Sequence, residues 1–229
     1  MDAYHFVLAS QSPRRRELLR LLGYPFEVYV ADVDEDVHLS AGPADYVRLT
    51  AAQKAEAAAH VLAASRRDRP ALLIAADTTV ALDGAILAKP ADADDARRML
   101  TALRGRTHAV HTGLCVVDLA NGREVRAVHT TTVTMRAYTA AEIDAYVATG
   151  DPLDKAGAYA IQHPRFNPVA ALDGCYLTVV GLSLCGLIAA LGEFGVPCRA
   201  MRASLLAAHD GYPCPLLGQV WKQCQGAPT

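Results

Sequence analysis

The chain has 229 residues, 52% of them apolar, and a formal net charge of −2 at pH 7. That length suits one sizeable α/β domain or two small ones, and the apolar content excludes a largely disordered chain. The near-neutral charge argues against a protein that coats nucleic acid, because such proteins carry an excess of Lys and Arg.

The chain opens with a predicted strand, helix and strand. Residues 6–9 form an apolar run typical of a short buried strand. Ser12 then caps a helix whose first residue is Pro13, where the missing N–H costs no hydrogen bond. Four leucines give this helix an apolar face, and a second strand over residues 26–30 runs into an acidic loop at 32–36.

The next part alternates helix and strand. An Ala-rich helix is expected over residues 43–64, followed by a continuous apolar strand over 71–76 that is typical of burial on both faces. This strand is predicted to stop at Asp77. An Asp-Gly pair then marks a tight hairpin over residues 79–87, and a helix with an acidic first turn follows over 92–103.

Two long strands come next, over residues 108–118 and 125–135, joined through an Asn-Gly turn. A helix is expected over 139–148. Three more elements complete the pattern: a strand over 158–162, a strand over 177–180 and a helix over 182–191. Strands that alternate with helices and include hairpins predict an α/β fold, with a mixed twisted sheet flanked by helices.

The last part of the chain is predicted to be irregular. Residues after 196 are rich in Cys, Pro and Gly and contain the lone Trp221. We therefore set residues 197–229 apart as a C-terminal extension with no assigned role, distinct from a domain over residues 1–196.

The N-terminus has no basic segment followed by an apolar run, so no secretory signal is predicted. No stretch approaches the roughly 18 apolar residues that span a bilayer. A cytoplasmic location without membrane contact is expected. The cysteines are then predicted to be free thiols, incidental and not part of a metal site, because none has C-x-x-C or zinc-finger spacing. They are Cys115, Cys175, Cys185, Cys198, Cys214 and Cys224.

The turn between the first strand and the first helix has the chemistry of a polyphosphate cradle. The N-terminus of a helix presents unpaired N–H groups and partial positive charge. Hydroxyls of Ser10 and Ser12 and the guanidinium groups of Arg14, Arg15 and Arg16 add donors. The alternative is a capped surface helix with solvated arginines. The segment lacks the Gly-rich Walker pattern, so it is not a P-loop.

Acidic residues follow two of the predicted strands. Asp77 stands where a buried strand is expected to end, a usual place for functional side chains in open α/β sheets. Asp32, Asp34, Glu35 and Asp36 follow another strand. Carboxylates that converge from two strand ends can hold Mg²⁺ or Mn²⁺, and one of them can activate a water. The alternative is a solvated acidic loop.

Basic side chains and histidines give weaker signals. Lys54, Lys89 and Lys155 are scattered, and each alone is typical of a surface lysine. The histidines show no metal pattern: His108 and His111 are three apart on a predicted strand and would point to opposite faces.

Several motifs occur in a fixed order that resembles the Maf family of nucleoside triphosphate pyrophosphatases, the septum-formation-inhibitor-like proteins. The resemblance covers about residues 6–192. The main matching pieces are Leu8-Ala9-Ser10-Gln11-Ser12-Pro13-Arg14-Arg15-Arg16, Asp32-Val33-Asp34-Glu35, Ala75-Ala76-Asp77-Thr78, Leu87-Ala88-Lys89-Pro90 and Asp151-Pro152-Leu153-Asp154-Lys155-Ala156-Gly157.

The resemblance implies an inosine-triphosphatase-like α/β fold, with two lobes around a central cleft over residues 1–196. It also implies a homodimer and a divalent metal, Mg²⁺ or Mn²⁺. The implied reaction is that of a nucleoside triphosphate diphosphatase, a hydrolase that releases pyrophosphate and the monophosphate. The family's proton acceptor matches Asp77, which with Glu35 is expected to hold the metal. The implied substrate-binding positions are Ser10, Arg14, Arg15, Lys54, Thr78, Lys89 and Gln162.

Base preference differs between family subgroups. Arg14, Thr78 and Gln162 resemble the subgroup that acts on dTTP, UTP and modified pyrimidine nucleotides, whereas a sister subgroup prefers 7-methyl-GTP. The chain departs from the usual pattern at Thr178, in place of Asn, and at Ser183, in place of Pro. A non-catalytic nucleotide-binding regulator of cell division and a nucleic-acid-binding module are the other functions considered.

Overall fold

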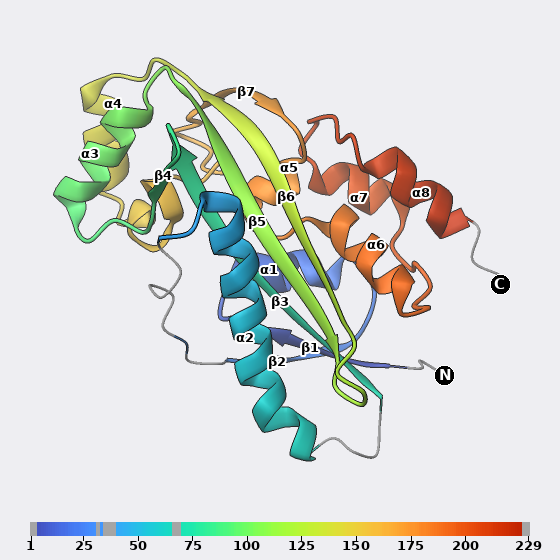
Figure 1. Ribbon diagram of the computed structural model, residues 1–229. Helices are drawn as coiled ribbons and strands as arrows, with labels where there is room; N and C mark the ends of the chain where they lie inside the picture. The colour runs from blue at the N-terminus through green and yellow to red at the C-terminus, as the bar shows by residue number, and fades with distance from the viewer. Residues whose placement is uncertain (1–3, 31–32, 34–39, 66–69, 226–229) are drawn as a thin grey trace.

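A mixed sheet runs through the middle of the protein (Figure 1). The computed structural model describes residues 4–30, 33, 40–65 and 70–225. The strand order is β2-β1-β3-β5-β6-β7, and β4 pairs with β3. The strands are β1 (His5–Ala9), β2 (Phe26–Tyr29), β3 (Ala71–Leu82), β4 (Ala85–Leu87), β5 (Thr107–Asp118), β6 (Glu124–Met135) and β7 (Val169–Asp173).

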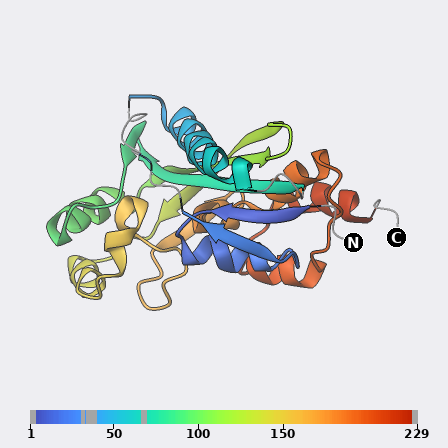
Figure 2. The same cartoon turned by 90° about the horizontal axis from the view of Figure 1, so that it is seen from below.

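Helices lie on both faces of this sheet. They are α1 (Pro13–Arg20), α2 (Pro43–Ser65), α3 (Ala93–Leu103), α4 (Ala140–Val147), the 3₁₀ turns η2 (Asp151–Asp154) and η3 (Ala156–Ala158), α5 (Tyr176–Val180), α6 (Leu184–Glu193), α7 (Arg202–Ala208) and α8 (Leu217–Gln225). Figure 2 shows α2 above the sheet and α1 and α6 below it. The predicted α/β fold with a mixed sheet flanked by helices is confirmed.

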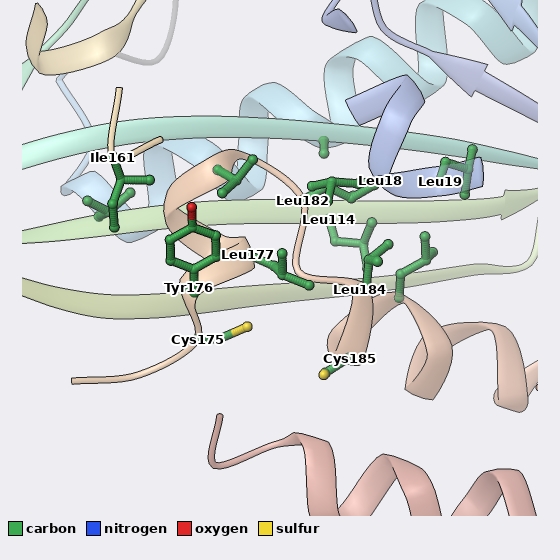
Figure 3. Packing of buried hydrophobic residues seen from close by; sticks show 14 of the residues in the cluster. Leu18, Leu19, Leu114, Ile161, Cys175, Tyr176, Leu177, Leu182, Leu184 and Cys185 are labelled. Atoms are coloured by element: carbon green, nitrogen blue, oxygen red, sulfur yellow. The ribbon is translucent and has the colours of Figure 1, made fainter. Parts of the chain in front are cut away.

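Each face of the sheet has its own hydrophobic core. Ala51, Ala55 and Ala58 of α2 pack with one set of strand residues, whereas the helices of the other face form a larger cluster. Figure 3 shows part of that larger cluster, where leucines of α1, α5 and α6 meet the sheet. The small Ala side chains let α2 lie close to the strands.

Alternation along β3 places two neighbouring polar residues on opposite faces. Leu73 and Ala75 belong to the α2 core, whereas Leu72 and Ile74 belong to the other. Since side chains alternate along a strand, Asp77 joins the α2 face and Thr78 the face of α1 and α5.

One edge of β3 is left unpaired near Asp77 and Thr78, on the side where β1 lies. β5 pairs with β3 from Leu72 to Ala81, whereas β1 pairs only with residues 71–75 and β4 only with residues 80–82. Within the described pairings, residues 76–79 therefore have a strand neighbour on one side alone. A ligand at this gap, beside the carboxyl end of β1, reaches side chains from both faces of the sheet.

Gly113 explains how α2 approaches the sheet here. It lies opposite Asp77 in the β3–β5 register. A Cβ atom at this position would stand 2.2 Å from the Val47 carbonyl oxygen of α2, so no side chain fits. The glycine thus brings α2 within reach of Asp77.

Several predicted elements differ from the structure. β3 does not stop at Asp77 but continues to Leu82, because its pairing with β5 is uninterrupted. The predicted strand over 158–162 is wrong, since Gly157 and Ala158 have φ values of 68° and 60°, which exclude an extended chain. The predicted strand over 177–180 is also wrong. It is helix α5, a short apolar run whose sequence does not separate helix from strand.

The C-terminal part also differs from the prediction. β7 was not predicted. Its five residues form a strand by pairing with β6, a contact remote in sequence. The segment after residue 196 is not irregular: it contains α7 and α8, and Leu205 and Val220 pack into the larger core. The division at residue 197 stays a prediction.

The prediction of six free thiols is wrong for two of them. Cys198 and Cys224 form a disulfide with their Cα atoms 4.9 Å apart, within the range that such a bond requires. Their separation of 26 residues gave no signal of pairing. Cys115, Cys175, Cys185 and Cys214 are free thiols. None of the helices in the described ranges is long and apolar enough to cross a membrane.

Candidate active site

A cavity of about 740 Å³ opens at the gap beside β3. Five basic side chains line it, Arg14, Arg15, Lys54, Lys89 and Lys155, against two acidic ones, Asp77 and Asp154, among the described residues. An excess of positive charge in a concave site attracts a polyanion. Ser10, Thr78 and Gln162 also line the cavity. The structure thus brings together every predicted site residue except Glu35, which lies outside the described residues.

The turn before α1 forms a rigid set of donors. Ser12 caps the helix by accepting from the Arg15 N–H at 3.4 Å, as predicted, and Pro13 is its first residue. The Ser12 N–H donates to Ser10 Oγ at 3.2 Å, and Arg15 Nη1 donates to the same oxygen at 3.3 Å. Arg16 is not among the lining residues. This turn can bind phosphate oxygens through backbone and side chain together.

Arg15 is held from behind by the opposite wall. Its Nε donates to the Gly181 carbonyl oxygen at 2.8 Å, and its Nη2 donates to Thr78 Oγ1 at 3.2 Å. Thr78 Oγ1 lies 2.9 Å from Thr112 Oγ1, which donates to the Thr178 carbonyl oxygen at 2.7 Å. A planar guanidinium fixed on several sides presents its remaining donors in one orientation.

Asp77 and Lys54 form a buried ion pair on the α2 face. Lys54 Nζ lies 2.7 Å from Asp77 Oδ1, and the two side chains are 14% and 8% exposed. Strand alternation and the tight seat of α2 at Gly113 place these groups together. Lys54 contacts the Oδ1 atom of Asp77, and Asp77 lines the cavity.

Lys155 is a site residue that the sequence prediction left out. It is buried, and its Nζ donates to the Asp151 carbonyl oxygen at 2.6 Å and to Asp154 Oδ1 at 2.6 Å. Asp154 also lies 3.9 Å from Arg14 Nη1. Its sequence signals were the two aspartates before it and its place in the Asp151–Gly157 motif, and a lone lysine in a loop is usually solvated.

The remaining predicted residues lie at the rim. Lys89 and Gln162 are exposed and line the cavity from the β4 and η3 side. Thr178 and Ser183, the two departures from the family pattern, do not line it. Ser183 instead caps α6 by accepting from the Gly186 N–H at 3.3 Å.

His108 is buried behind this wall. Its Nε2 lies 2.8 Å from the hydroxyl of Tyr159, a lining residue. Burial lowers the pKa of His108 to about 4, so the ring is neutral near pH 7. His111 contacts Thr130 on β6 instead, so the two histidines do not meet in one metal site.

The donor atoms of the cavity suit a hard divalent cation. Asp77 offers a carboxylate, and Mg²⁺ is commonly bound by one or two carboxylates together with substrate phosphates and water. No thiol or imidazole lies among the lining residues in the described part of the chain. The residues present therefore fit Mg²⁺ or Mn²⁺ better than a metal that prefers sulfur.

Together the fold and the cavity define a class of protein. It is an α/β protein with a cavity suited to a polyanion, lined by a helix N-terminus, fixed basic side chains and a buried carboxylate. The chain belongs to the Maf family: residues 5–194 match the family described as Maf-like protein. The resemblance predicted from the motifs is confirmed.

Several relatives with similar sequences are named dTTP/UTP pyrophosphatases. The chain is 47% identical over 206 residues to the dTTP/UTP pyrophosphatase of Salinibacter ruber, which covers 89% of this chain and 94% of that protein. It is 48% identical over 196 residues to that of Myxococcus xanthus, with 86% and 95% covered. The one from Moorella thermoacetica is 47% identical over 190 residues, with 83% and 95% covered.

Two solved structures show a more distant likeness. The dITP/XTP pyrophosphatase of Mycobacterium abscessus is 18% identical, with a TM-score of 0.39, over 58% of this chain and 73% of that one. The Ham1 protein of Staphylococcus aureus is 16% identical, with a TM-score of 0.42, over 58% and 72%. Both scores are below those at which a shared fold is established.

Proposed function

We propose that this protein is a nucleoside triphosphate pyrophosphatase that hydrolyses dTTP or UTP to the monophosphate and pyrophosphate. The observation that carries the proposal is the buried Asp77–Lys54 pair in the same cavity as the Arg15–Ser10 phosphate cradle. The names of the relatives, dTTP/UTP pyrophosphatase at 47% and 48% identity, support both the reaction and the pyrimidine base.

In this proposal the triphosphate is bound by the basic wall. The turn at Ser10 and Ser12 and the guanidinium of Arg15 bind its oxygens, and Lys155 approaches from the opposite loop. Arg14 and Lys89 add positive charge at the rim. Because Arg15 and Lys155 are already held by hydrogen bonds, little side-chain freedom is lost on binding.

Asp77 is the proposed general base. Its carboxylate takes a proton from a water whose oxygen attacks the α-phosphorus, and the bond to the bridging oxygen breaks as pyrophosphate leaves. Lys54 holds the carboxylate in place from 2.7 Å. Arg15 offsets the negative charge that grows on the leaving pyrophosphate.

A divalent cation, Mg²⁺ or Mn²⁺, would be held by Asp77 and, as a proposed second ligand, by Glu35. It would supply a Lewis acid at the phosphate oxygens. Thr78, Gln162 and Arg14 are the proposed base-selecting positions. The homodimer, which the family resemblance implies, and the cytoplasmic location, expected from the sequence, stay predictions.

The proposal is tested by measuring pyrophosphate release from dTTP, UTP, CTP, GTP, dATP and 7-methyl-GTP, with Mg²⁺ and with Mn²⁺. We expect the highest kcat/KM with dTTP and UTP. Asp77→Asn should lower kcat by about 100-fold or more, since it removes the general base. Asp83→Asn is the matched control, because Asp83 is exposed on the β3–β4 turn, where it pairs with Arg106 outside the cavity.

Different failures of this experiment have different meanings. Preference for GTP or 7-methyl-GTP would overturn the pyrimidine assignment and leave the reaction standing. Nucleotide binding without turnover would favour a regulator. Near-normal kcat in a folded Asp77→Asn protein would remove Asp77 from the mechanism.

A further inference from the structure

Four side chains with soft or borderline metal-binding atoms converge on the side of α5 and α6 that faces the C-terminal segment. They are Cys175 before α5, Cys185 in α6, His209 at the end of α7 and Cys214 in the following loop. Figure 3 shows Cys175 and Cys185 on the side of the cluster nearer the ribbon of that segment. We propose that this cluster is a structural zinc site of the Cys₃His type.

The distances within the cluster are those of a tetrahedron. Zn–S bonds of about 2.3 Å and Zn–N bonds of about 2.0 Å place two sulfurs about 3.8 Å apart and a sulfur and a nitrogen about 3.5 Å apart. Cys185 Sγ lies 3.8 Å from Cys214 Sγ, and His209 Nε2 lies 3.5 Å from Cys175 Sγ and 3.9 Å from Cys185 Sγ.

Two further pairs, Cys175 with Cys214 and His209 with Cys214, are also close. The ligand atoms of Cys175, His209 and Cys214 all lie within 4.8 Å of one another. Cys185 joins this group through His209 and Cys214, so one ion among the four would draw Cys175 and Cys185 together. Disulfide formation would satisfy only two sulfurs, whereas a metal ion satisfies all four ligand atoms.

The imidazole of His209 is already oriented for ligation. Its Nδ1 lies 2.6 Å from the carbonyl oxygen of Leu205, to which it can donate a proton. That hydrogen bond fixes the tautomer in which Nε2 carries a lone pair directed at the cysteines. Metal-binding histidines commonly have such a partner on the other nitrogen, and it raises the basicity of the ligand.

The site is closed and separate from the catalytic cavity. Cys175, Cys185 and His209 are at most 3% exposed, and none of the four ligands lines the cavity. Four protein ligands without an open position are typical of structural zinc, and thiolates select zinc over Mg²⁺ or Mn²⁺. The inference therefore does not depend on the proposed catalytic function.

The ligands come from two parts of the chain that the metal would join. Cys175 and Cys185 flank α5, whose C-terminal Gly181 binds Arg15, while His209 and Cys214 belong to the C-terminal segment. Binding exchanges the thiol protons for the metal, so its free energy adds to that of folding. The spacing of the four residues matches no zinc-finger pattern, and the sequence alone therefore favoured incidental thiols.

The first test uses the full-length wild-type protein, freed of any affinity tag and purified under reducing conditions with added Zn²⁺. Elemental analysis after extensive dialysis should find about one zinc per chain. Replacing it with Co²⁺ should give the visible d–d bands of tetrahedral cobalt and a thiolate-to-cobalt charge-transfer band. Neither measurement depends on whether a variant folds.

Variants locate the metal. Cys214→Ser, at a partly exposed position, should lose the zinc and the charge-transfer intensity. Cys115→Ser is the matched control, since Cys115 is a buried free thiol in the α2 core. Asp77→Asn should also keep the zinc, which distinguishes this site from the catalytic cavity.

Three outcomes would overturn the inference. They are a folded, reduced wild-type protein that retains no zinc and gives no cobalt bands, equal zinc in Cys214→Ser and wild type, and loss of zinc in Asp77→Asn. A Cys185–Cys214 disulfide in the protein purified without reductant, with no metal taken up after its reduction, would likewise assign the cluster to thiol chemistry.

Discussion

The Lys54 ammonium contacts Asp77 inside the protein, so its loss should affect both folding and turnover. Lys54→Met would leave a buried carboxylate without its partner, which costs about 3 kcal/mol of unfolding free energy. We also expect kcat to fall, because the proposed base loses the group that positions it. Urea unfolding and pyrophosphate release measure the two effects.

Lys89→Met is the control for that prediction. Lys89 lines the same cavity but is exposed. Its loss should raise KM for the nucleotide and leave unfolding unchanged. Equal stability of the Lys54→Met protein and the wild type would show that the ion pair contributes nothing to the fold.

His108 makes stability depend on pH. The pKa of His108 is lowered by burial from 6.5 to about 4. Between these values the unfolded chain binds a proton that the folded protein excludes, so acid favours unfolding. The contribution of His108 is fully present above pH 6.5 and is lost as the pH falls toward 4, by up to about 3 kcal/mol.

Unfolding by urea at several pH values between 4 and 7 checks this dependence, with His108→Gln as the test variant. Its stability should change less with pH than that of the wild type. Some slope should persist, because burial also lowers the pKa of His111 and of His129. An identical slope in the variant would exclude His108 as its source.

For single residues, the sequence predicted the chemical role of a side chain better than its contacts in the folded protein. Ser12 and Pro13 follow local rules of helix capping, so their roles could be predicted from neighbouring residues. The burial of Lys155 could not, because it depends on Asp151 and Asp154 folding back around its ammonium. The Asp77–Lys54 contact likewise depends on how α2 packs against the sheet, which the sequence does not show.

Helix α2 depends on one glycine for its position over the sheet. Gly113→Ala would bring a methyl group against the Val47 carbonyl, so α2 must move outward and carry Lys54 from Asp77. We expect a loss of about 1–3 kcal/mol, the usual cost of overpacking, together with lower kcat. Thermal unfolding and turnover measure both.

Gly218→Ala is the matched control for this change. Gly218 lies in α8 with no atom within 4 Å of the position a Cβ would take. Because Ala favours a helix, this variant should be as stable as the wild type or more stable. Wild-type stability and activity in Gly113→Ala would mean that α2 adjusts without strain.

The elements that were predicted wrongly share a cause. The long strands β5 and β6 and the helices α2 and α3 carry enough periodic residues to be recognised from sequence. Helix α5 has only five residues, four of them apolar, too few to show a helical period, and it ends at Gly181 with φ of 122°. Strand β7 exists because it pairs with β6, a contact remote in sequence.

At the scale of the whole molecule, the C-terminal segment is part of the folded body. Leu205 and Val220 are buried in the larger core, and α8 contacts α6 (Figure 1). The sequence offered no family pattern there, and its packing depends on surfaces formed by residues far earlier in the chain. Within this segment, the Cys198–Cys224 disulfide closes a loop whose contribution to stability can be measured.

Replacing both cysteines with Ala, as Cys198→Ala with Cys224→Ala, should lower stability by about 3 kcal/mol, because a loop of 26 residues gains freedom in the unfolded chain. Neither residue lines the cavity, so kcat and KM should not change. Reductant should lower the melting temperature of the wild type to that of the double variant and leave the variant unaffected. Since the four proposed zinc ligands are retained, its zinc content should equal that of the wild type. A reductant effect of equal size in both proteins would place the sensitive bond elsewhere.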